Sequence, residues 1–121
     1  HPNLKMVMLE SGWSWLPSYL WRLHKFWRGV RMETPWVDRS PQEIVRSNIR
    51  FSLQPIDAPP DPAILHRLFD HMQSDELLLF STDYPHWDMD EPRFVLSKLR
   101  IDKADQQRII AGNAKELYKL T

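Results

Sequence analysis

Apolar and polar positions follow two rhythms along the chain, one typical of strands and one typical of helices. Residues 3–10 are mostly apolar, residues 49–54 place Ile, Phe and Leu at every second position, and residues 75–81 contain the run ELLLF. A period of two, or a short continuous apolar run, indicates a strand. The sequence therefore predicts three strands, over residues 3–10, 49–54 and 75–81.

Between the first two strands the apolar residues recur at helical spacing. From Trp15 to about Val30, one apolar stripe is formed at positions i, i+4, i+7 and i+11 by Leu16, Leu20, Leu23 and Trp27. A second helix is predicted to begin after Ser40, because Pro41 and Glu43 complete the pattern of a capping box.

The second half of the chain contains further helix signals. Asp61 is placed to cap a helix whose first residue is Pro62, where a proline is tolerated. Another helix is expected from about Pro92 to Leu99. The chain between the third strand and this helix has the composition of a loop, TDYPHWDMDEP.

The C-terminal segment is predicted as one helix and one short turn. The helix is capped by Asp102 and runs to Ala111, and Gly112 is expected to end it. Asn113 is expected to cap the last turn.

Strands and helices thus alternate along the chain, which predicts the α/β class with a parallel sheet covered by helices. In such folds functional groups lie at the carboxyl ends of the strands. Those ends are Glu10, Gln54 and Asp83. Because three strands are few for an independent parallel sheet, the chain is expected to form part of a larger fold.

The composition is that of an ordinary globular domain. The chain has 121 residues, of which 42% are hydrophobic and 26% are charged, and its formal net charge is zero. No apolar run approaches the ~20 residues of a membrane span, so no membrane partner is expected. The absence of cysteine excludes disulfides, cysteine-bound zinc and a thiol nucleophile, and it fits a cytoplasmic location.

Charge is distributed unevenly but mildly. Residues 1–50 hold eight Lys and Arg against four Asp and Glu, and residues 51–121 hold eight against twelve. Four basic residues lie at helical spacing opposite the leucine stripe, which is typical of a solvated helix face. They are Arg22, Lys25, Arg28 and Arg31. No nucleic-acid partner is therefore expected.

Three motifs together resemble one known family. They are FSTDYPHWD at residues 80–88, IIAGNAKELYKL at 109–120 and HPNLKMVMLESGWSWLP at 1–17. In their order and spacing they resemble the C-terminal part of the amidohydrolase superfamily, in the branch that includes aminocarboxymuconate-semialdehyde decarboxylase. In that family an Asp-Tyr-Pro motif follows the last barrel strand, and a Gly-Asn-Ala motif lies close to the end of the chain.

The resemblance implies an architecture. The three strands would be strands six to eight of a (β/α)8 TIM barrel with their helices. Residues 1–121 would then be the C-terminal part of a single barrel domain. Because a complete barrel takes about 250 residues, the chain is expected to be a fragment of a longer one.

The resemblance also implies a role for Asp83, and His86 lies three residues further on in the same loop. Asp83 matches the family's strand-eight aspartate, which binds the catalytic metal and acts as general base or acid. Judged from the residues alone, Asp83 could instead cap the turn before Pro85. His86 would contact the substrate and take part in catalysis, or it would be a hydrogen-bonded loop residue.

Glu10 marks a departure from the family, whose decarboxylases have a histidine metal ligand at this strand-six position. Here the stretch is Glu10-Ser11-Gly12. Glu10 could bind a hard metal ion through oxygen, support the ligands from behind, or contact the substrate. The expected cofactor is a divalent metal ion, zinc in the first place, and its remaining ligands would lie outside this chain.

Trp13 and Trp15 follow the end of the first predicted strand. Both are candidates to line a substrate pocket, with packing in the core or at a subunit interface as the alternative, which is preferred for Trp15. His66 and His71 are five residues apart, whereas a helical zinc pair is separated by four. We expect them at the surface, and we expect His24 on a helix face.

These observations predict the C-terminal segment of a metal-dependent hydrolase or decarboxylase that acts on a small organic acid. By itself the segment is expected to be inactive. Exposed strand edges and apolar faces are expected to make it a homo-oligomer. The alternative is a degenerate, non-catalytic barrel segment kept for association, which the loss of the strand-six histidine favours.

Overall fold

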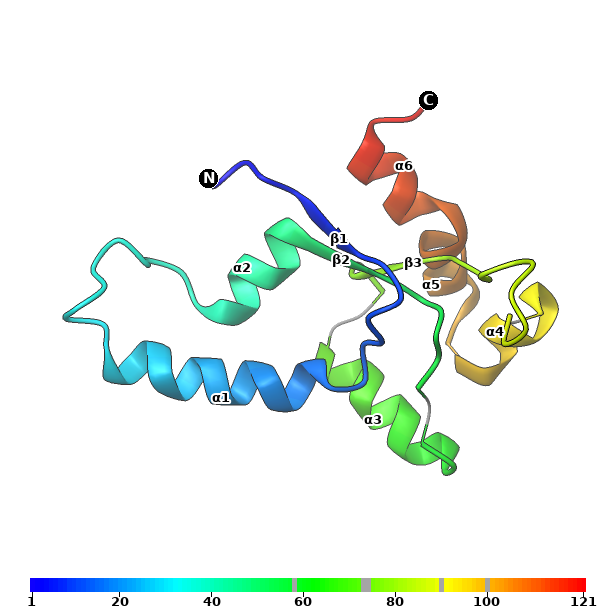
Figure 1. Cartoon of the computed structure of the whole chain (residues 1–121), viewed down its shortest axis with the longest axis horizontal. Coiled ribbons are helices and arrows are strands. Elements are labelled where there is room, and N and C mark those ends of the chain that lie inside the picture. Colours follow the sequence, from blue (N-terminus) through cyan, green and yellow to red (C-terminus); the bar gives the residue numbers. More distant parts are fainter. Residues whose placement is uncertain (58, 73–74, 90, 100) are drawn as a thin grey trace.

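The computed structural model describes residues 1–57, 59–72, 75–89, 91–99 and 101–121. Within them three strands form one parallel sheet in the order β1-β2-β3 (Figure 1). The strands are β1 Met6–Met8, β2 Ile49–Ser52 and β3 Leu78–Leu79. The α/β arrangement with parallel strands, predicted from the alternation of elements, is confirmed.

Each strand is shorter than its predicted segment, because only residues that face a partner complete the ladder. Met6 pairs with Ile49, and Phe51 pairs with Leu78. The backbone bonds from Phe51 to Leu77 (2.9 Å) and from Leu53 to Leu79 (2.8 Å) hold β2 against β3. The apolar pattern therefore located the strands, and the pairing between neighbouring strands determined where each strand begins and ends.

Helices surround the sheet and connect its strands (Figure 1). Among the described residues six are α-helical, and a π-helical segment, η1, joins the last two. None of the helices among the described residues is long and apolar enough to cross a membrane. Their bounds are α1 Leu16–Gly29, α2 Pro41–Asn48, α3 Pro62–Met72, α4 Pro92–Leu99, α5 Lys103–Gln107, η1 Arg108–Gly112 and α6 Asn113–Tyr118.

Local sequence signals account for the starts of several helices. At α2 the Ser40 hydroxyl accepts from the Glu43 amide (3.3 Å), and the Glu43 carboxylate accepts from the Ser40 amide (2.7 Å). This is the predicted capping box, which satisfies two donors that the first helical turn leaves unpaired. Asp102 likewise accepts from the Asp105 amide (2.9 Å) at the start of α5.

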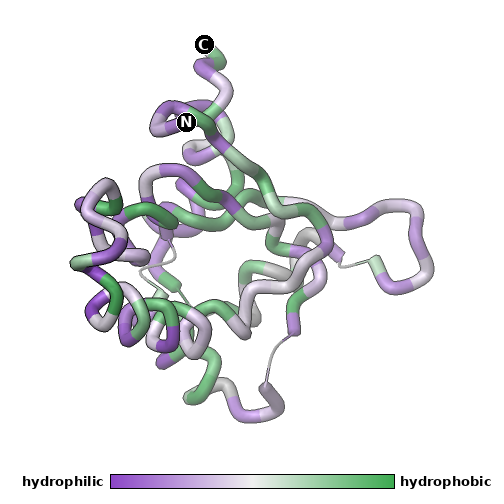
Figure 2. The backbone as a smooth tube through the Cα atoms, turned by 60° about the vertical axis from the view of Figure 1, so that its left-hand side comes forward, coloured by the Kyte–Doolittle hydropathy of each residue, from purple (hydrophilic) through white to green (hydrophobic). Residues whose placement is uncertain are grey.

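The core lies between the sheet and the inner sides of α1 and α3. Each turn of the helices carries both hydrophobic and hydrophilic residues, as in amphipathic helices (Figure 2). On α1 the predicted stripe is buried at Leu16 and Leu20, and it becomes half-buried at Leu23 and Trp27. The second half of α1 therefore extends beyond the core.

The C-terminal segment differs from the prediction. Gly112 does not end a helix, because the chain continues through η1 into α6 and ends its helical path at Lys119, which has a left-handed backbone. Asn113 does not cap a turn. Its side chain is buried and donates to the carbonyls of Asp75 and Leu78. These expectations were wrong because the partners of Asn113 lie some 35 residues away in the sequence.

The π-helical turn has a structural consequence at the end of β3. The Asn113 amide donates to the Arg108 carbonyl, five residues back, rather than to the carbonyl of Ile109. The Ile109 carbonyl instead accepts from the Phe80 amide (3.0 Å). The end of β3 is thereby attached to the C-terminal helices at two points, through Phe80 and through the Asn113 side chain.

Replacing Asn113 tests this attachment. Asn113→Ala removes the donor and leaves the buried Leu78 carbonyl without that bond, so we expect the free energy of unfolding to fall by about 1–3 kcal/mol. Urea denaturation followed by tryptophan fluorescence measures the change. Lys115→Ala, an exposed change on the same helix, should alter stability by less than ~0.5 kcal/mol. Equal effects of the two changes would contradict the assignment.

Candidate functional site

The carboxyl ends of the three strands are joined by hydrogen bonds that backbone amides donate to serine hydroxyls. The Glu10 amide donates to the Ser52 hydroxyl (2.9 Å), which in turn donates to the Gln54 carbonyl (2.9 Å). The Gln54 amide donates to the Ser81 hydroxyl (3.0 Å). The three strand ends that the sequence marked therefore form one surface, with Glu10, Gln54 and Asp83 beside one another.

Two adjoining cavities open on this surface, and both are lined by Glu10, Gln54 and Asp83. One has a volume of about 150 Å³ and is completed by Leu9, Ser52 and Ser81. The other has a volume of about 230 Å³ and is completed by Pro55, His86 and Asp88. The cavities are of a size for small molecules, and their ionisable groups are mainly carboxylates.

A larger cavity, of about 570 Å³, lies at the other end of the strands. It is lined mostly by apolar side chains, among them Leu4, Met6 and Trp36, together with Asp38 and Arg39. Functional groups of parallel α/β folds gather at the carboxyl ends of the strands. For this reason we place the candidate site at the smaller cavities.

The backbone around the site adopts conformations that non-glycine residues rarely occupy. Glu10 and Asp83 have φ values of 51° and 57°, each in the left-handed region, and Gly12 has a φ of 61°. At Gly12 a side chain would also collide with the Asp57 carboxylate. A left-handed conformation costs a non-glycine residue about 1–2 kcal/mol. Such strain gathers at functional sites, and here it occurs at the two predicted acidic residues.

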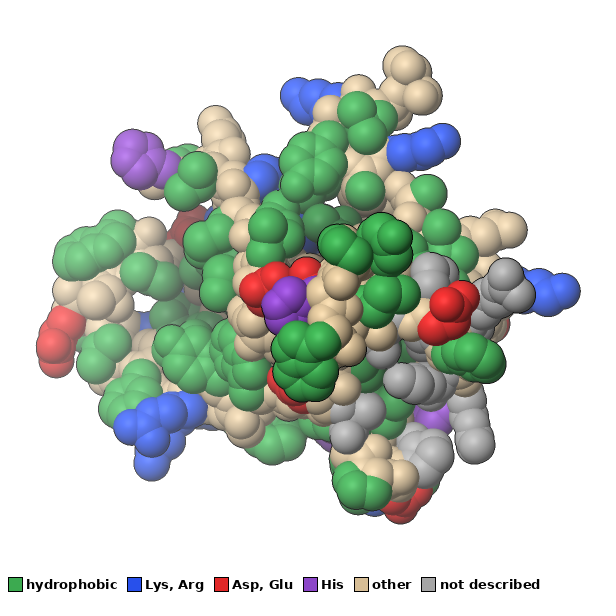
Figure 3. Space-filling model, turned by 45° about the vertical axis from the view of Figure 1, so that its right-hand side comes forward, with side chains coloured by type: hydrophobic (Ala, Val, Ile, Leu, Met, Phe, Trp, Pro, Cys, Tyr) green, Lys and Arg blue, Asp and Glu red, His purple; other side chains and the backbone are tan. Residues whose placement is uncertain are grey.

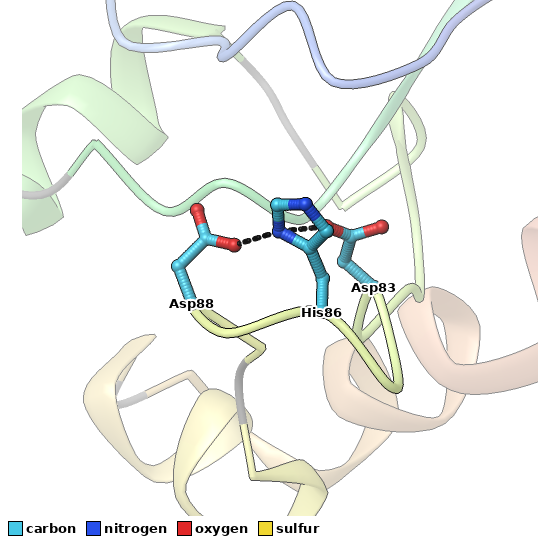
Figure 4. Close-up of side chains that lie close together, drawn as sticks. All are labelled: Asp83, His86 and Asp88. Atoms are coloured by element: carbon cyan, nitrogen blue, oxygen red, sulfur yellow. Dashed lines mark hydrogen bonds and ion pairs between the residues drawn. The ribbon is translucent and has the colours of Figure 1, made fainter.

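The loop after β3 brings two carboxylates to one histidine (Figure 4). His86 Nδ1 lies 2.6 Å from Asp88 Oδ1 and 3.5 Å from Asp83 Oδ2. The loop is closed by the His86 amide, which donates to the Asp83 carbonyl (2.8 Å). Ligand atoms of the three side chains all lie within 4.8 Å of one another, as they would around a metal ion.

The site is open to solvent. The His86 side chain is 59% exposed and the Asp83 side chain is 28% exposed. On the face turned forward in Figure 3, a histidine and acidic side chains lie together beside hydrophobic ones. The hydrogen bond to Asp88 raises the pKa of His86, and the charges of Asp83 and Glu10 add to the rise. The same hydrogen bond lowers the pKa of Asp88.

Trp13 lies in the core rather than at the site. Its side chain is fully buried, its indole N–H donates to the Leu53 carbonyl (3.2 Å), and its ring meets Phe69 edge to face. This placement corrects the expectation that Trp13 contacts a substrate. Trp15, expected in the core or at a subunit interface, is partly exposed and contacts Tyr19 and Phe51.

Three other histidines, His24, His66 and His71, lie on helices. His71 is exposed on α3 and meets Trp21 edge to face, and His66 is half-buried on the same helix. His24 is half-buried on α1 beside Trp27. None of the three lines the cavities of the candidate site.

Asp88 is one of the site residues that the sequence did not indicate. Its only local signal is the short spacing His-Trp-Asp in a loop, which is common between residues that do not touch. Ser52 and Ser81 were also missed, because a hydroxyl that joins two strands is recognisable only when the register is known.

The His86–Asp88 contact predicts a titration behaviour. Because the pKa of folded His86 is raised, the imidazolium should persist above the ~6.5 of an exposed histidine. Any stability that the pair contributes is present below that pH and is lost as the pH rises through the folded pKa. Asp88→Asn should lower the pKa of His86, as measured by NMR of the imidazole C–H protons. The same change at Asp38, at the other end of the strands, should not; identical titrations in all three proteins would refute the prediction.

Comparison with known proteins identifies the family and the fold of this chain. The sequence profile of the amidohydrolase family matches residues 1–120. No curated protein matches the sequence significantly. Among solved structures, 5-carboxyvanillate decarboxylase LigW from Sphingomonas paucimobilis has a TM-score of 0.71 and 21% identity, over 99% of this chain and 35% of that one.

Two further structures share the fold. An amidohydrolase from Mycobacterium avium subsp. paratuberculosis has a TM-score of 0.67 and 24% identity, over 97% of this chain and 28% of that one. A dihydroxybenzoic acid decarboxylase from Polaromonas, with bound manganese and the inhibitor 2-nitroresorcinol, has a TM-score of 0.58 and 21% identity, over 98% and 35%. The chain thus spans about a third of the length of these proteins. A profile match over nearly all of its residues, on a fold shared with these enzymes, shows that the chain belongs to the amidohydrolase family.

Proposed function

We propose that this chain is the C-terminal part of a metal-dependent enzyme that hydrolyses or decarboxylates a small organic acid. The observation that carries the proposal is the convergence of Glu10, Asp83 and His86 on one cavity of about 230 Å³ at the carboxyl ends of parallel strands. That is where barrel enzymes place their catalytic groups. Membership of the amidohydrolase family supports the reaction class.

We assign β1, β2 and β3 to strands six, seven and eight of the barrel, within a longer polypeptide. The fold match covers nearly all of this chain but only 35% of LigW, which supports the assignment. The site is then complete only when the other strands are present. The 121-residue segment alone should accordingly show no turnover.

The residues at the site fit a divalent metal ion. Asp83 and Glu10 would hold it, and their carboxylates line the same two cavities. With Glu10 in place of a histidine the donors are richer in oxygen, which suits manganese or magnesium as well as zinc. The Polaromonas relative, with its bound manganese, is consistent with this choice. When bound, such an ion polarises a substrate oxygen and lowers the pKa of a coordinated water.

The chain's own groups would bind the acid and move a proton. The raised pKa of His86 favours its charged form, which attracts the carboxylate of a small acid into the cavity. The Asp83 carboxylate can take a proton at Oδ2 and return it, since a carboxylate beside the reacting group is a competent general base. For Asp83 this is the role that the family resemblance implied, and for His86 it is one of the two alternatives that the sequence left open.

A second function, association, is favoured by exposed apolar side chains along β1. Leu4, Met6 and Leu9 are 61%, 45% and 71% exposed. A cavity of about 300 Å³ between the sheet and α1 is lined by Met6, Met8, Trp15 and Tyr19. A free edge with an apolar groove tends to find a partner chain. We propose that the 121-residue chain forms homo-oligomers through this edge.

The enzymatic proposal predicts coupled losses of metal and of turnover. Asp83→Asn keeps a residue that tolerates the left-handed backbone but removes the charged ligand, so Mn²⁺ affinity measured by EPR should fall about tenfold or more. Glu10→Gln should also weaken it. In a longer polypeptide that includes residues 1–121, Asp83→Asn should lower turnover of a panel of small acids by at least about 100-fold.

The control for this experiment is Asp38→Asn, an exposed carboxylate at the other end of the sheet. It should leave metal affinity and turnover unchanged. The enzymatic proposal fails if both survive in Asp83→Asn.

The association proposal predicts that the sedimentation coefficient of the 121-residue chain rises with concentration. Leu4→Lys, which places a charge beside β1, should reduce that rise. Leu120→Lys changes a leucine of similar exposure (59%) in the C-terminal segment and should have no effect. A monodisperse monomer at all concentrations would contradict the prediction.

A further inference from the structure

Asp88 contacts the imidazole ring of His86 through one of its two nitrogen atoms, Nδ1. Asp88 Oδ1 lies 2.6 Å from His86 Nδ1, within the range of a charge-assisted hydrogen bond. Asp83 Oδ2 lies 3.5 Å from the same nitrogen, beyond a good hydrogen bond. Asp88, rather than Asp83, is therefore the hydrogen-bond partner of His86.

The other ring nitrogen, Nε2, points away from both carboxylates (Figure 4). Glu10 lines the same cavity as His86, and its charge contributes to the electrostatic field at the ring. Nε2 is thus the imidazole atom that remains for a ligand in the cavity. The orientation of the imidazole ring decides whether Nε2 can contact a ligand in the cavity.

The loop that carries Asp88 is held to the end of β2. The Gln54 side chain is 4% exposed, and its Nε2 donates to the Asp88 carbonyl (3.4 Å). Within the loop, the Met89 amide donates to the His86 carbonyl (3.2 Å). Asp88 is therefore supported from the buried strand end, although its own carboxylate is exposed.

A carboxylate on Nδ1 also selects the tautomer of a histidine. When Nδ1–H donates to Asp88, the neutral ring carries its lone pair on Nε2. When the ring takes a proton at Nε2, its positive charge remains paired with Asp88, as in other aspartate–histidine pairs. Asp83, at 3.5 Å from Nδ1, makes only a longer ion-pair contact with the ring and keeps its proposed role.

We infer that Asp88 is a positioning residue, which holds His86 through Nδ1 so that Nε2 faces the cavity and meets the substrate. The inference rests on the proposed function for the substrate contact, whereas the contact between the two side chains can be tested separately. The competing arrangement is a metal ion held by Asp83, His86 Nδ1 and Asp88 together.

Long-range ¹H–¹⁵N NMR of the 121-residue chain, at a pH where the imidazole is neutral, identifies the nitrogen that carries the proton. We expect Nδ1–H in the unchanged chain, loss of that preference in Asp88→Ala, and partial retention in Asp88→Asn, whose amide oxygen still accepts. Asp38→Ala, at the other end of the strands, should behave as the unchanged chain. An identical tautomer in all four proteins would overturn the inference.

Addition of Zn²⁺ in the same spectra separates the two arrangements. If Nδ1 keeps its proton, the positioning contact stands. If Zn²⁺ displaces that proton, His86 is a metal ligand and the inference fails.

Kinetic measurements on the longer polypeptide test the second part of the inference, the contact between His86 and the substrate. Asp88→Ala should lower kcat/KM about 10- to 100-fold, Asp88→Asn should restore part of it, and Asp88→Ala should add little to His86→Gln. Full additivity would overturn the inference. If Asp83→Asn leaves turnover intact while the tautomer still depends on Asp88, the proposed function fails and the contact between Asp88 and His86 remains supported.

Discussion

The hydrogen bond from the Phe80 amide to the Ile109 carbonyl is the constraint on which the site depends. It joins the last residue before the acidic loop to the C-terminal helices. It can form because the π-helical turn pairs the Asn113 amide with Arg108 and leaves the Ile109 carbonyl available. The Asn113 side chain adds a second attachment at Leu78. These two attachments hold the two-residue strand β3 in place, and β3 in turn sets the position of the loop that carries Asp83 and His86.

Polar side chains then convert three separate strand ends into one surface. The Ser52 and Ser81 hydroxyls bridge neighbouring strands, and Gln54 supports the loop at Asp88. Buried hydroxyls and amides are favourable only where each finds a partner. Those pairings depend on the parallel register, so the polar network and the strand order support each other.

The open side of the sheet connects the fold to the two proposed functions. A parallel sheet is usually covered on both faces, and in a complete barrel it has no free edge. Here β1 is an edge strand, and apolar side chains beside it are exposed. Both proposals start from this open edge: the proposed metal site would need ligands from further strands, and the exposed apolar surface is suited to association. Completion of the barrel and self-association would therefore compete for one edge.

The sequence by itself determined the features that depend on near neighbours. Alternation located the strands, the Ser40 and Asp102 caps located helix starts, and the motif around Asp83 indicated the family and the acidic site. Each of these signals acts over a few residues, so no knowledge of the fold is needed to interpret it.

Only the tertiary structure decided which distant groups meet. Asn113 became a buried donor instead of a cap, and Trp13 entered the core while Trp15 remained partly exposed. The Asp88 backbone became attached to the Gln54 side chain at the end of β2, 34 residues away in the sequence. In each case the interaction free energy comes from a partner whose position is set by the sheet register and helix packing. Composition and spacing along the chain do not contain that position.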